Sequence, residues 1–260
     1  MSDNHSPRLQ VVFCWHMHQP YYKGPDKSDY QLPWVYLHGI KDYADMVFHL
    51  EQHPMARVVV NFAPVLLEQI EDYARQIRAW LDRGILIQDP LLAALAGPGL
   101  PVDDASRKEI ILACLRANEQ RLIHRFKHFS ELVGLAKHTL ENPAMLPYLG
   151  DQFLIDLMVW YHMAWMGEST RVNDLRIRSM QAKGQGFSND DRRRLMELIW
   201  ETLHGVTGRY AKLARLGQIE LSVTPYAHPI VPLLIDIGSA REALPDIDMP
   251  QLNAGGIGLG

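Results

Sequence analysis

Three short apolar segments, widely separated along the chain, constrain the fold more than any other feature. They span residues 9–15, 57–62 and 218–223, and each contains β-branched or aromatic side chains. Runs of this length and composition predict buried β-strands. The second segment leads into Pro64, at a favoured first position of a helix, and a strand followed by a helix is half of a βαβ unit. We therefore expect an α/β fold with parallel strands.

The chain between the second and third segments has the pattern of helices. Apolar residues recur there at three- and four-residue spacing, Ser106 and Glu109 form a capping-box pattern, and a further helix is expected after residues 188–191. A stretch of this length exceeds an ordinary crossover between strands. We expect an α-helical insertion over about residues 80–215, a disordered tail at residues 1–8, and a domain over residues 9–260. The glycine-rich residues 253–260 are expected to form a loop.

Composition excludes several classes of protein. The formal net charge of −4 disfavours a general nucleic-acid surface, and no apolar run is long enough for a transmembrane helix. Cys14 and Cys114 include no C-x-x-C motif, which excludes a cysteine zinc site or a disulfide framework. P-loop, G-x-S-x-G and H-E-x-x-H motifs are also missing from the sequence. We expect a cytoplasmic protein that binds neither nucleic acid nor membrane and needs no cofactor or metal.

Polar side chains gather where the predicted strands end. They are His16 and His18 after the first, Asn61 at the second, and Glu220, Tyr226 and His228 in or beyond the third. Sites in parallel α/β folds form at the carboxyl ends of strands. His16 and His18 point the same way from a strand, and a carboxylate such as Glu220 is costly to bury unpaired. These three residues are the candidate site, with a structural ion pair as the alternative for Glu220.

Four segments, in this order, resemble glycoside hydrolase family 57, and the resemblance covers about residues 9–245. It rests on residues 16–21 (HMHQPY), residues 61–70 (NFAPVLLEQI), residues 217–222 (GQIELS) and residues 224–230 (TPYAHPI). The family includes α-amylases, amylopullulanases, glucanotransferases and branching enzymes. The resemblance implies the N-terminal part of an incomplete (β/α)7 barrel with a large α-helical insertion.

The same resemblance implies a carbohydrate-active function. His16 and His18 would contact the sugar at the cleavage site, and Glu220 would bind its hydroxyl groups. A retaining glycosidase also needs a nucleophile and an acid/base. The family's glutamate nucleophile and aspartate acid/base are expected beyond Gly260. We therefore expect a truncated α-glucan hydrolase or transglycosidase, with no catalytic residue of its own and no activity alone, that binds an α-glucan or maltooligosaccharide.

Two alternative functions remain open. One is a non-catalytic, carbohydrate-binding remnant. The other is a metal-dependent hydrolase in which His16 and His18 are imidazole ligands and Glu220 is a third ligand or a base. The sequence does not predict the oligomeric state, although an open sheet edge would favour self-association.

Overall fold

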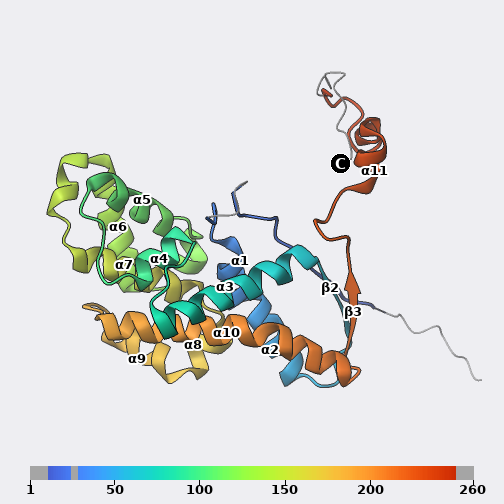
Figure 1. The fold of residues 1–260 in the computed structure, drawn as a ribbon, viewed down its shortest axis with the longest axis horizontal. Coiled ribbons are helices and arrows are strands. Elements are labelled where there is room, and N and C mark those ends of the chain that lie inside the picture. Colours follow the sequence, from blue (N-terminus) through green and yellow to red (C-terminus); the bar gives the residue numbers. More distant parts are fainter. Residues whose placement is uncertain (1–10, 25–28, 250–260) are drawn as a thin grey trace, which may run out of the picture.

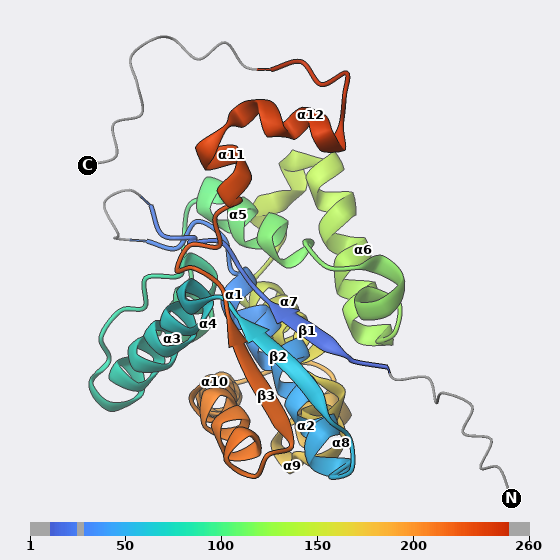
Figure 2. The ribbon, with the colours of Figure 1, turned by 90° about the vertical axis from the view of Figure 1, so that its right-hand side faces the viewer.

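The computed structural model describes residues 11–24 and 29–249 of the chain. Within these ranges three strands form one parallel sheet in the order β1 (Cys14–Met17), β2 (Val58–Phe62) and β3 (Ile219–Val223). Helices lie behind one face of the sheet, and the other face is uncovered (Figure 2). The α/β class is therefore confirmed, whereas the (β/α)7 barrel stays a prediction.

The first strand begins later than the sequence predicts. Regular pairing starts at Cys14, and Val11, Val12 and Phe13 are exposed rather than buried. Among the described residues β1 pairs with β2 alone. The apolar residues that precede β1 therefore have no second strand beside them to cover their side chains. The predicted buried strand over residues 9–15 was thus wrong in its start and in its burial. Residues 1–10 and 253–260, with their predicted tails, lie outside the described residues.

The second strand and the helix after it form as predicted. Val58, Val60 and Phe62 are buried on one face of β2, and the alternate residues are half-buried on the other. The chain turns at once into α3 (Pro64–Arg83), whose first residue is the proline. This helix ends at Gly84, where a left-handed φ of 69° suits glycine.

The remaining elements are helical. The chain runs from α1 (Trp34–His38) through a π-helical segment (Gly39–Tyr43) into α2 (Ala44–Gln52). After α3 come α4 (Pro90–Ala96), α5 (Asp104–Cys114), α6 (Lys127–Glu141), α7 (Asp151–Trp165), α8 (Glu168–Asn173), α9 (Leu175–Lys183) and α10 (Asn189–Arg215). Two short helices, α11 (Val231–Ile235) and α12 (Ala240–Ala243), follow β3. Residues 84–218, all described, contain no strand, as their apolar spacing predicts; the division into domains stays a prediction.

The predicted capping box at Ser106 was wrong. The N-cap of α5 is Asp103, whose Oδ1 accepts a hydrogen bond of 2.8 Å from the Ser106 amide. The helix therefore begins three residues earlier than the pattern implies, and Ser106 lies in its first turn with its own amide capped by Asp103. The start of α10 is a true capping box, in which Ser188 and Asp191 each accept from the backbone amide of the other.

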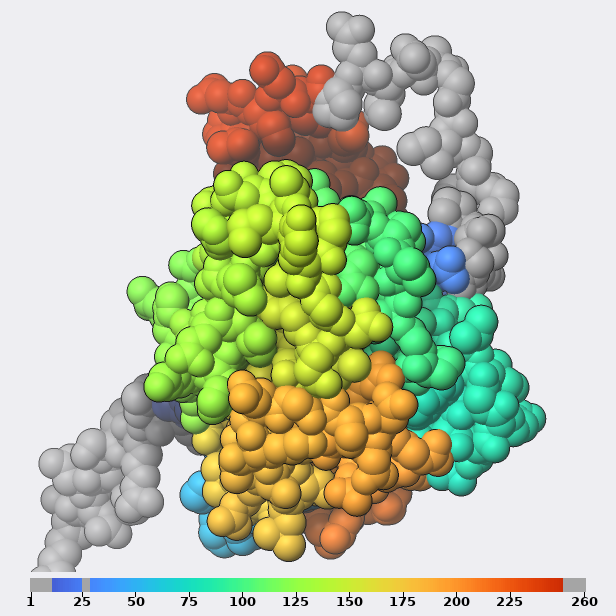
Figure 3. All heavy atoms as spheres, turned by 90° about the vertical axis from the view of Figure 1, so that its left-hand side faces the viewer, coloured from blue at the N-terminus to red at the C-terminus, as the bar shows by residue number. Residues whose placement is uncertain are grey.

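The core lies between the sheet and the helices. α3 and α10 pack side by side along the molecule, and α7, which is buried along most of its length, passes through the helical part (Figure 1). Seen from the side opposite the sheet, the visible surface of the main body is formed mainly by the helical part of the chain, coloured green to orange (Figure 3). Among the described residues, no helix combines the length and apolar character needed to cross a membrane.

Candidate functional site

A row of three polar residues crosses the uncovered face of the sheet. His16 in β1 is in register with Asn61 in β2, which is in register with Ser222 in β3. The Nδ1–H of His16 donates to the Asn61 side-chain oxygen over 2.7 Å, and the Asn61 amide nitrogen donates to Ser222 Oγ over 3.0 Å. The amide nitrogen can only donate, so its bond to Ser222 turns the amide oxygen toward His16. In the neutral form of His16, Nε2 is then an unprotonated acceptor.

Three histidines meet beside this row. His18 lies just beyond β1, and His228 lies in the turn after β3. The ring of His228 is 4.7 Å from that of His16 and 4.5 Å from that of His18, measured between centroids. One ring nitrogen from each of the three lies within 4.8 Å of the others. The carboxyl ends of β1 and β3 thus bring together groups that are 210 or more residues apart in the sequence.

A strained backbone position brings His228 into this cluster. Its φ is 51°, in the left-handed region, where residues other than glycine are uncommon and histidine is enriched. The amide of His228 donates to the carbonyl of Pro225 over 2.9 Å, which closes the turn. Tyr226 fastens the turn to α3, because its hydroxyl donates to the carboxylate of Glu68 and its carbonyl accepts from the amide of Val65. Such strain persists only where the surroundings hold it.

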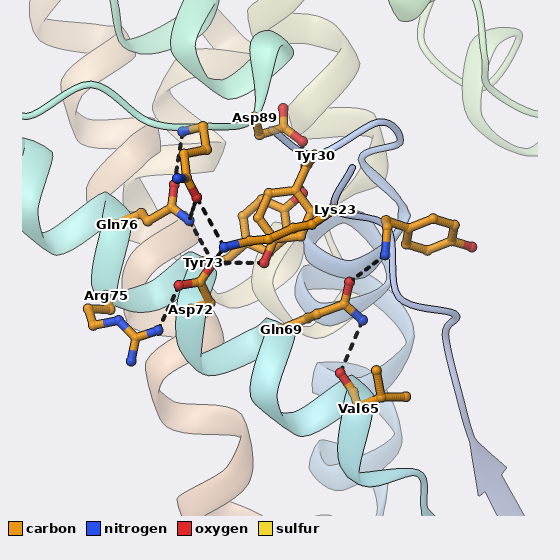
Figure 4. A network of polar contacts seen from close by, with 11 residues as sticks. Lys23, Tyr30, Val65, Gln69, Asp72, Tyr73, Arg75, Gln76 and Asp89 are labelled. Atoms are coloured by element: carbon orange, nitrogen blue, oxygen red, sulfur yellow. Dashed lines mark hydrogen bonds and ion pairs between the residues drawn. The ribbon is translucent and has the colours of Figure 1, made fainter. Parts of the chain in front are cut away.

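Helix α3 also holds the loop that carries His18. The buried side chain of Gln69 accepts from the amide of Tyr22 and donates to the carbonyl of Pro20, each over 2.9 Å. It also donates to the carbonyl of Val65 over 3.0 Å (Figure 4). All hydrogen-bonding positions of this buried amide except one lone pair are therefore used. The residues that directly follow His18 are fixed to the same helix that fixes the turn of His228.

A charged network extends this attachment. Lys23 pairs with Asp72 of α3 over 2.7 Å, and the hydroxyl of Tyr30 donates to the same carboxylate (Figure 4). Burial opposes ionisation of Asp72, but hydrogen bonds from Lys23, Arg75 and Tyr30 outweigh it and hold its pKa below the ordinary value. The charged Asp72 thus links α3 to Lys23 and Tyr30, which lie on either side of the undescribed residues 25–28.

The electrostatics of the cluster favour the neutral form of His18. Burial lowers the pKa of His18, and positive charge on His228 or His16 would lower it further. Among the described residues, neither His18 nor His228 has a hydrogen-bond partner for its ring nitrogens. A neutral His18 therefore offers an unprotonated nitrogen that can accept from a hydroxyl group or bind a cation.

Glu220 lies on the same face but outside the cluster. It is in register with Val59, and it precedes Ser222 by two residues, so that its Cβ is about 7 Å back along the strand. Its side chain is exposed, and no described residue forms an ion pair with it. The expectation of a buried carboxylate was wrong, because β3 is an edge strand and this face of the sheet is uncovered. The structural ion pair offered as its alternative is also not formed with any residue of the described ranges.

Of the candidate residues, the structure brings His16 and His18 together and adds His228. The sequence placed His228 beyond the third strand but did not select it. Its signal was a histidine in a proline-flanked turn after a parallel strand, between Pro225 and Pro229. Nothing local shows that this turn folds back over the end of β1, since that depends on the strand order.

A sequence model of a known protein family matches most of the chain. The sequence model described as Glycosyl hydrolase family 57 matches residues 12–249, which is most of the chain and includes all three strands and the histidine cluster. Neither the curated proteins nor the solved structures gave a match. From the extent of the family match, the chain belongs to glycosyl hydrolase family 57.

Proposed function

We propose that the uncovered sheet face binds an α-glucan or maltooligosaccharide. The observation that carries this proposal is the meeting of His16 and His18 at the carboxyl ends of the parallel strands, on an open face, in a chain of a glycoside hydrolase family. Sugar hydroxyl groups both donate and accept hydrogen bonds. Neutral imidazoles suit such a ligand, because each offers one donor and one acceptor.

Glu220 is proposed to bind hydroxyl groups rather than to attack the sugar. A retaining glycosidase holds two carboxyl groups about 5–5.5 Å apart. The neighbours of Glu220 on its face are Val59 across the strand pair and Ser222 along β3, and neither is acidic. Among the described residues no carboxylate joins the histidine cluster either. An exposed carboxylate without an acid partner suits hydroxyl binding, and we expect no turnover by this chain alone.

Titration calorimetry with maltoheptaose, beside assays on maltooligosaccharides and starch, tests this function. The wild-type chain should bind the oligosaccharide without turnover. His18→Ala and Glu220→Gln should each weaken binding about tenfold, on the scale of one lost charge-assisted hydrogen bond. His138→Ala, which changes an exposed histidine of α6 outside the site, should bind like the wild type.

The same measurements distinguish the competing functions. Turnover that disappears in Glu220→Gln would make Glu220 a catalytic residue and contradict the binding role. Binding without turnover supports the carbohydrate-binding function that the proposal assigns to these residues. Failure of the wild type to bind any maltooligosaccharide would overturn the proposal.

A further inference from the structure

We propose that His16, His18 and His228 form a binding site for a divalent transition-metal ion of the zinc type. The three donor nitrogens already lie within 4.8 Å of one another. Zinc–nitrogen bonds of about 2.0–2.1 Å in a tetrahedral site place ligand nitrogens about 3.3 Å apart. Rotation about the side-chain bonds of His18 and His228 closes this difference, because neither ring is held by a hydrogen bond to a described residue.

The residues behind the cluster prepare one ligand for a metal. Metal-binding histidines commonly donate their second ring N–H to an oxygen acceptor, which sets the tautomer and the ring orientation. His16 has this arrangement, since its Nδ1–H donates to Asn61. Ser222 in turn holds the orientation of the Asn61 amide. The pair Asn61–Ser222 therefore leaves Nε2 of His16 as the nitrogen with a lone pair for a metal ion.

The chemistry of the donors selects the class of cation. Three imidazoles bind zinc, cobalt, nickel and copper ions well, whereas calcium and magnesium prefer oxygen ligands. No carboxylate of the described residues belongs to the group. His16 is exposed and the face around it is uncovered, so a fourth coordination position would be open to solvent or to another ligand.

The third ligand differs from the one that the sequence suggests. Glu220 was the expected partner of His16 and His18, but it lies back along β3, outside the group. His228 takes that place through its left-handed backbone conformation. His228 comes from a separate part of the chain and supplies the same kind of donor as His16 and His18. That it does so through a strained backbone conformation is a second observation in favour of a metal site. The metal site does not depend on the carbohydrate proposal, because no sugar enters the argument.

Metal binding to tag-free protein tests this site directly. After treatment with a chelator and its removal, the chain should take up one Zn²⁺ in a competition titration with a chromophoric chelator. Co²⁺ should give the visible d–d absorption of a tetrahedral site, which addition of Zn²⁺ removes. Mg²⁺ should not compete. Absence of stoichiometric Zn²⁺ uptake, or a Co²⁺ spectrum of the octahedral aqua type, would overturn the proposal.

Matched variants locate the ion. His18→Ala and His228→Asn should weaken Zn²⁺ binding at least a hundredfold and abolish the tetrahedral Co²⁺ spectrum; asparagine at residue 228 tolerates the left-handed backbone. Asn61→Ala should weaken it about 10–100-fold, whereas Asn61→Asp keeps an oxygen acceptor for His16 and should retain it. His138→Ala should bind as the wild type does. Circular dichroism confirms that each variant is folded. Unchanged affinity in folded His228→Asn, or an equal loss in His138→Ala, would contradict the site.

Discussion

At the scale of single residues, two buried ionisable groups make the stability of the fold change with pH in opposite directions. His162 of α7 is fully buried, with Nδ1–H donating to the carbonyl of Met158 and Nε2 accepting from the hydroxyl of Tyr36. Asp89 is buried at the start of α4, where it caps the helix and accepts from the hydroxyl of Tyr73. The rings of Tyr36 and Tyr73 lie 5.3 Å apart, so both groups belong to one buried polar region.

His162 should stabilise the fold above pH 6.5 and cease to do so in acid. Burial lowers its pKa from 6.5 to about 4, so between these values the unfolded chain binds more protons than the folded chain. Its contribution, about 3 kcal/mol, is present above pH 6.5 and is lost as the pH falls toward 4. In His162→Gln the glutamine oxygen still accepts from Tyr36 but does not titrate. Urea unfolding at a series of pH values should show a smaller acid loss in this variant, and an unchanged pH profile would contradict the prediction.

Asp89 should act in the opposite direction over nearly the same range. Burial raises its pKa from 3.8 to about 6, and so the folded chain holds the proton more tightly than the unfolded chain. Stability from this group is present in acid and is lost as the pH rises through 6. In Asp89→Asn the amide oxygen still caps the helix, and the amide nitrogen can donate to the hydroxyl oxygen of Tyr73, without a charge. At pH 7 the free energy of unfolding of this variant should be higher by on the order of 2–3 kcal/mol. Equal or lower stability of Asp89→Asn at pH 7 would show that the charged form is not disfavoured.

At the scale of elements, α3 organises both loops of the site. Val65 and Glu68 hold the turn of His228, and Gln69 and Asp72 hold the loop after His18. These four residues lie on the first three turns of one helix, directly after β2. The long helix α10 packs along α3 and leads into β3. It therefore also supports the strand that precedes the turn of His228.

Removal of the N-terminal cap of α10 should destabilise the fold without affecting the site. Ser188→Ala removes the side chain that accepts from the amide of Asp191, and we expect a loss of about 1 kcal/mol in the free energy of unfolding. Ser188→Asp keeps an acceptor at the N-cap and is the matched control, which should lose less. Guanidinium unfolding measures both. A loss in Ser188→Asp as large as in Ser188→Ala would show that the cap is not responsible.

At the scale of the whole molecule, the sheet has two open edges and one uncovered face. β1 and β3 each pair only with β2 among the described residues. Leu221 and Val223 of β3 are 51% and 69% exposed, and α11 exposes Leu234 and Ile235 beyond the main body. Unpaired strand edges beside exposed apolar residues favour association with another chain.

We therefore predict concentration-dependent self-association through the β3 edge. Val223→Lys places a charge on this edge and should shift the chain toward monomer, while its stability changes by no more than about 0.5 kcal/mol. Leu86→Lys changes an apolar residue that is 82% exposed between α3 and α4, away from the sheet, and should leave association unchanged. Sedimentation velocity over a range of concentrations measures this. A wild-type chain that stays monomeric throughout would refute the prediction.

Local patterns in the sequence were sufficient for most elements. β2, the start of α3 at Pro64, the helical character of residues 84–218 and β3 follow from apolar spacing and turn residues that act over a few positions. The candidate pair His16 and His18 could be found in the same way, because two residues of one strand end share a face.

Only the tertiary structure decided which distant residues meet and which faces are covered. Strand order and register place His228 beside His18, put Asn61 between His16 and Ser222, and leave Glu220 exposed. Sequence periodicity distinguishes the two faces of a strand but does not state what lies against either face. Burial and proximity depend on long-range packing, and that is why the burial predicted for Glu220 and for the start of β1 was wrong while the strands themselves were predicted.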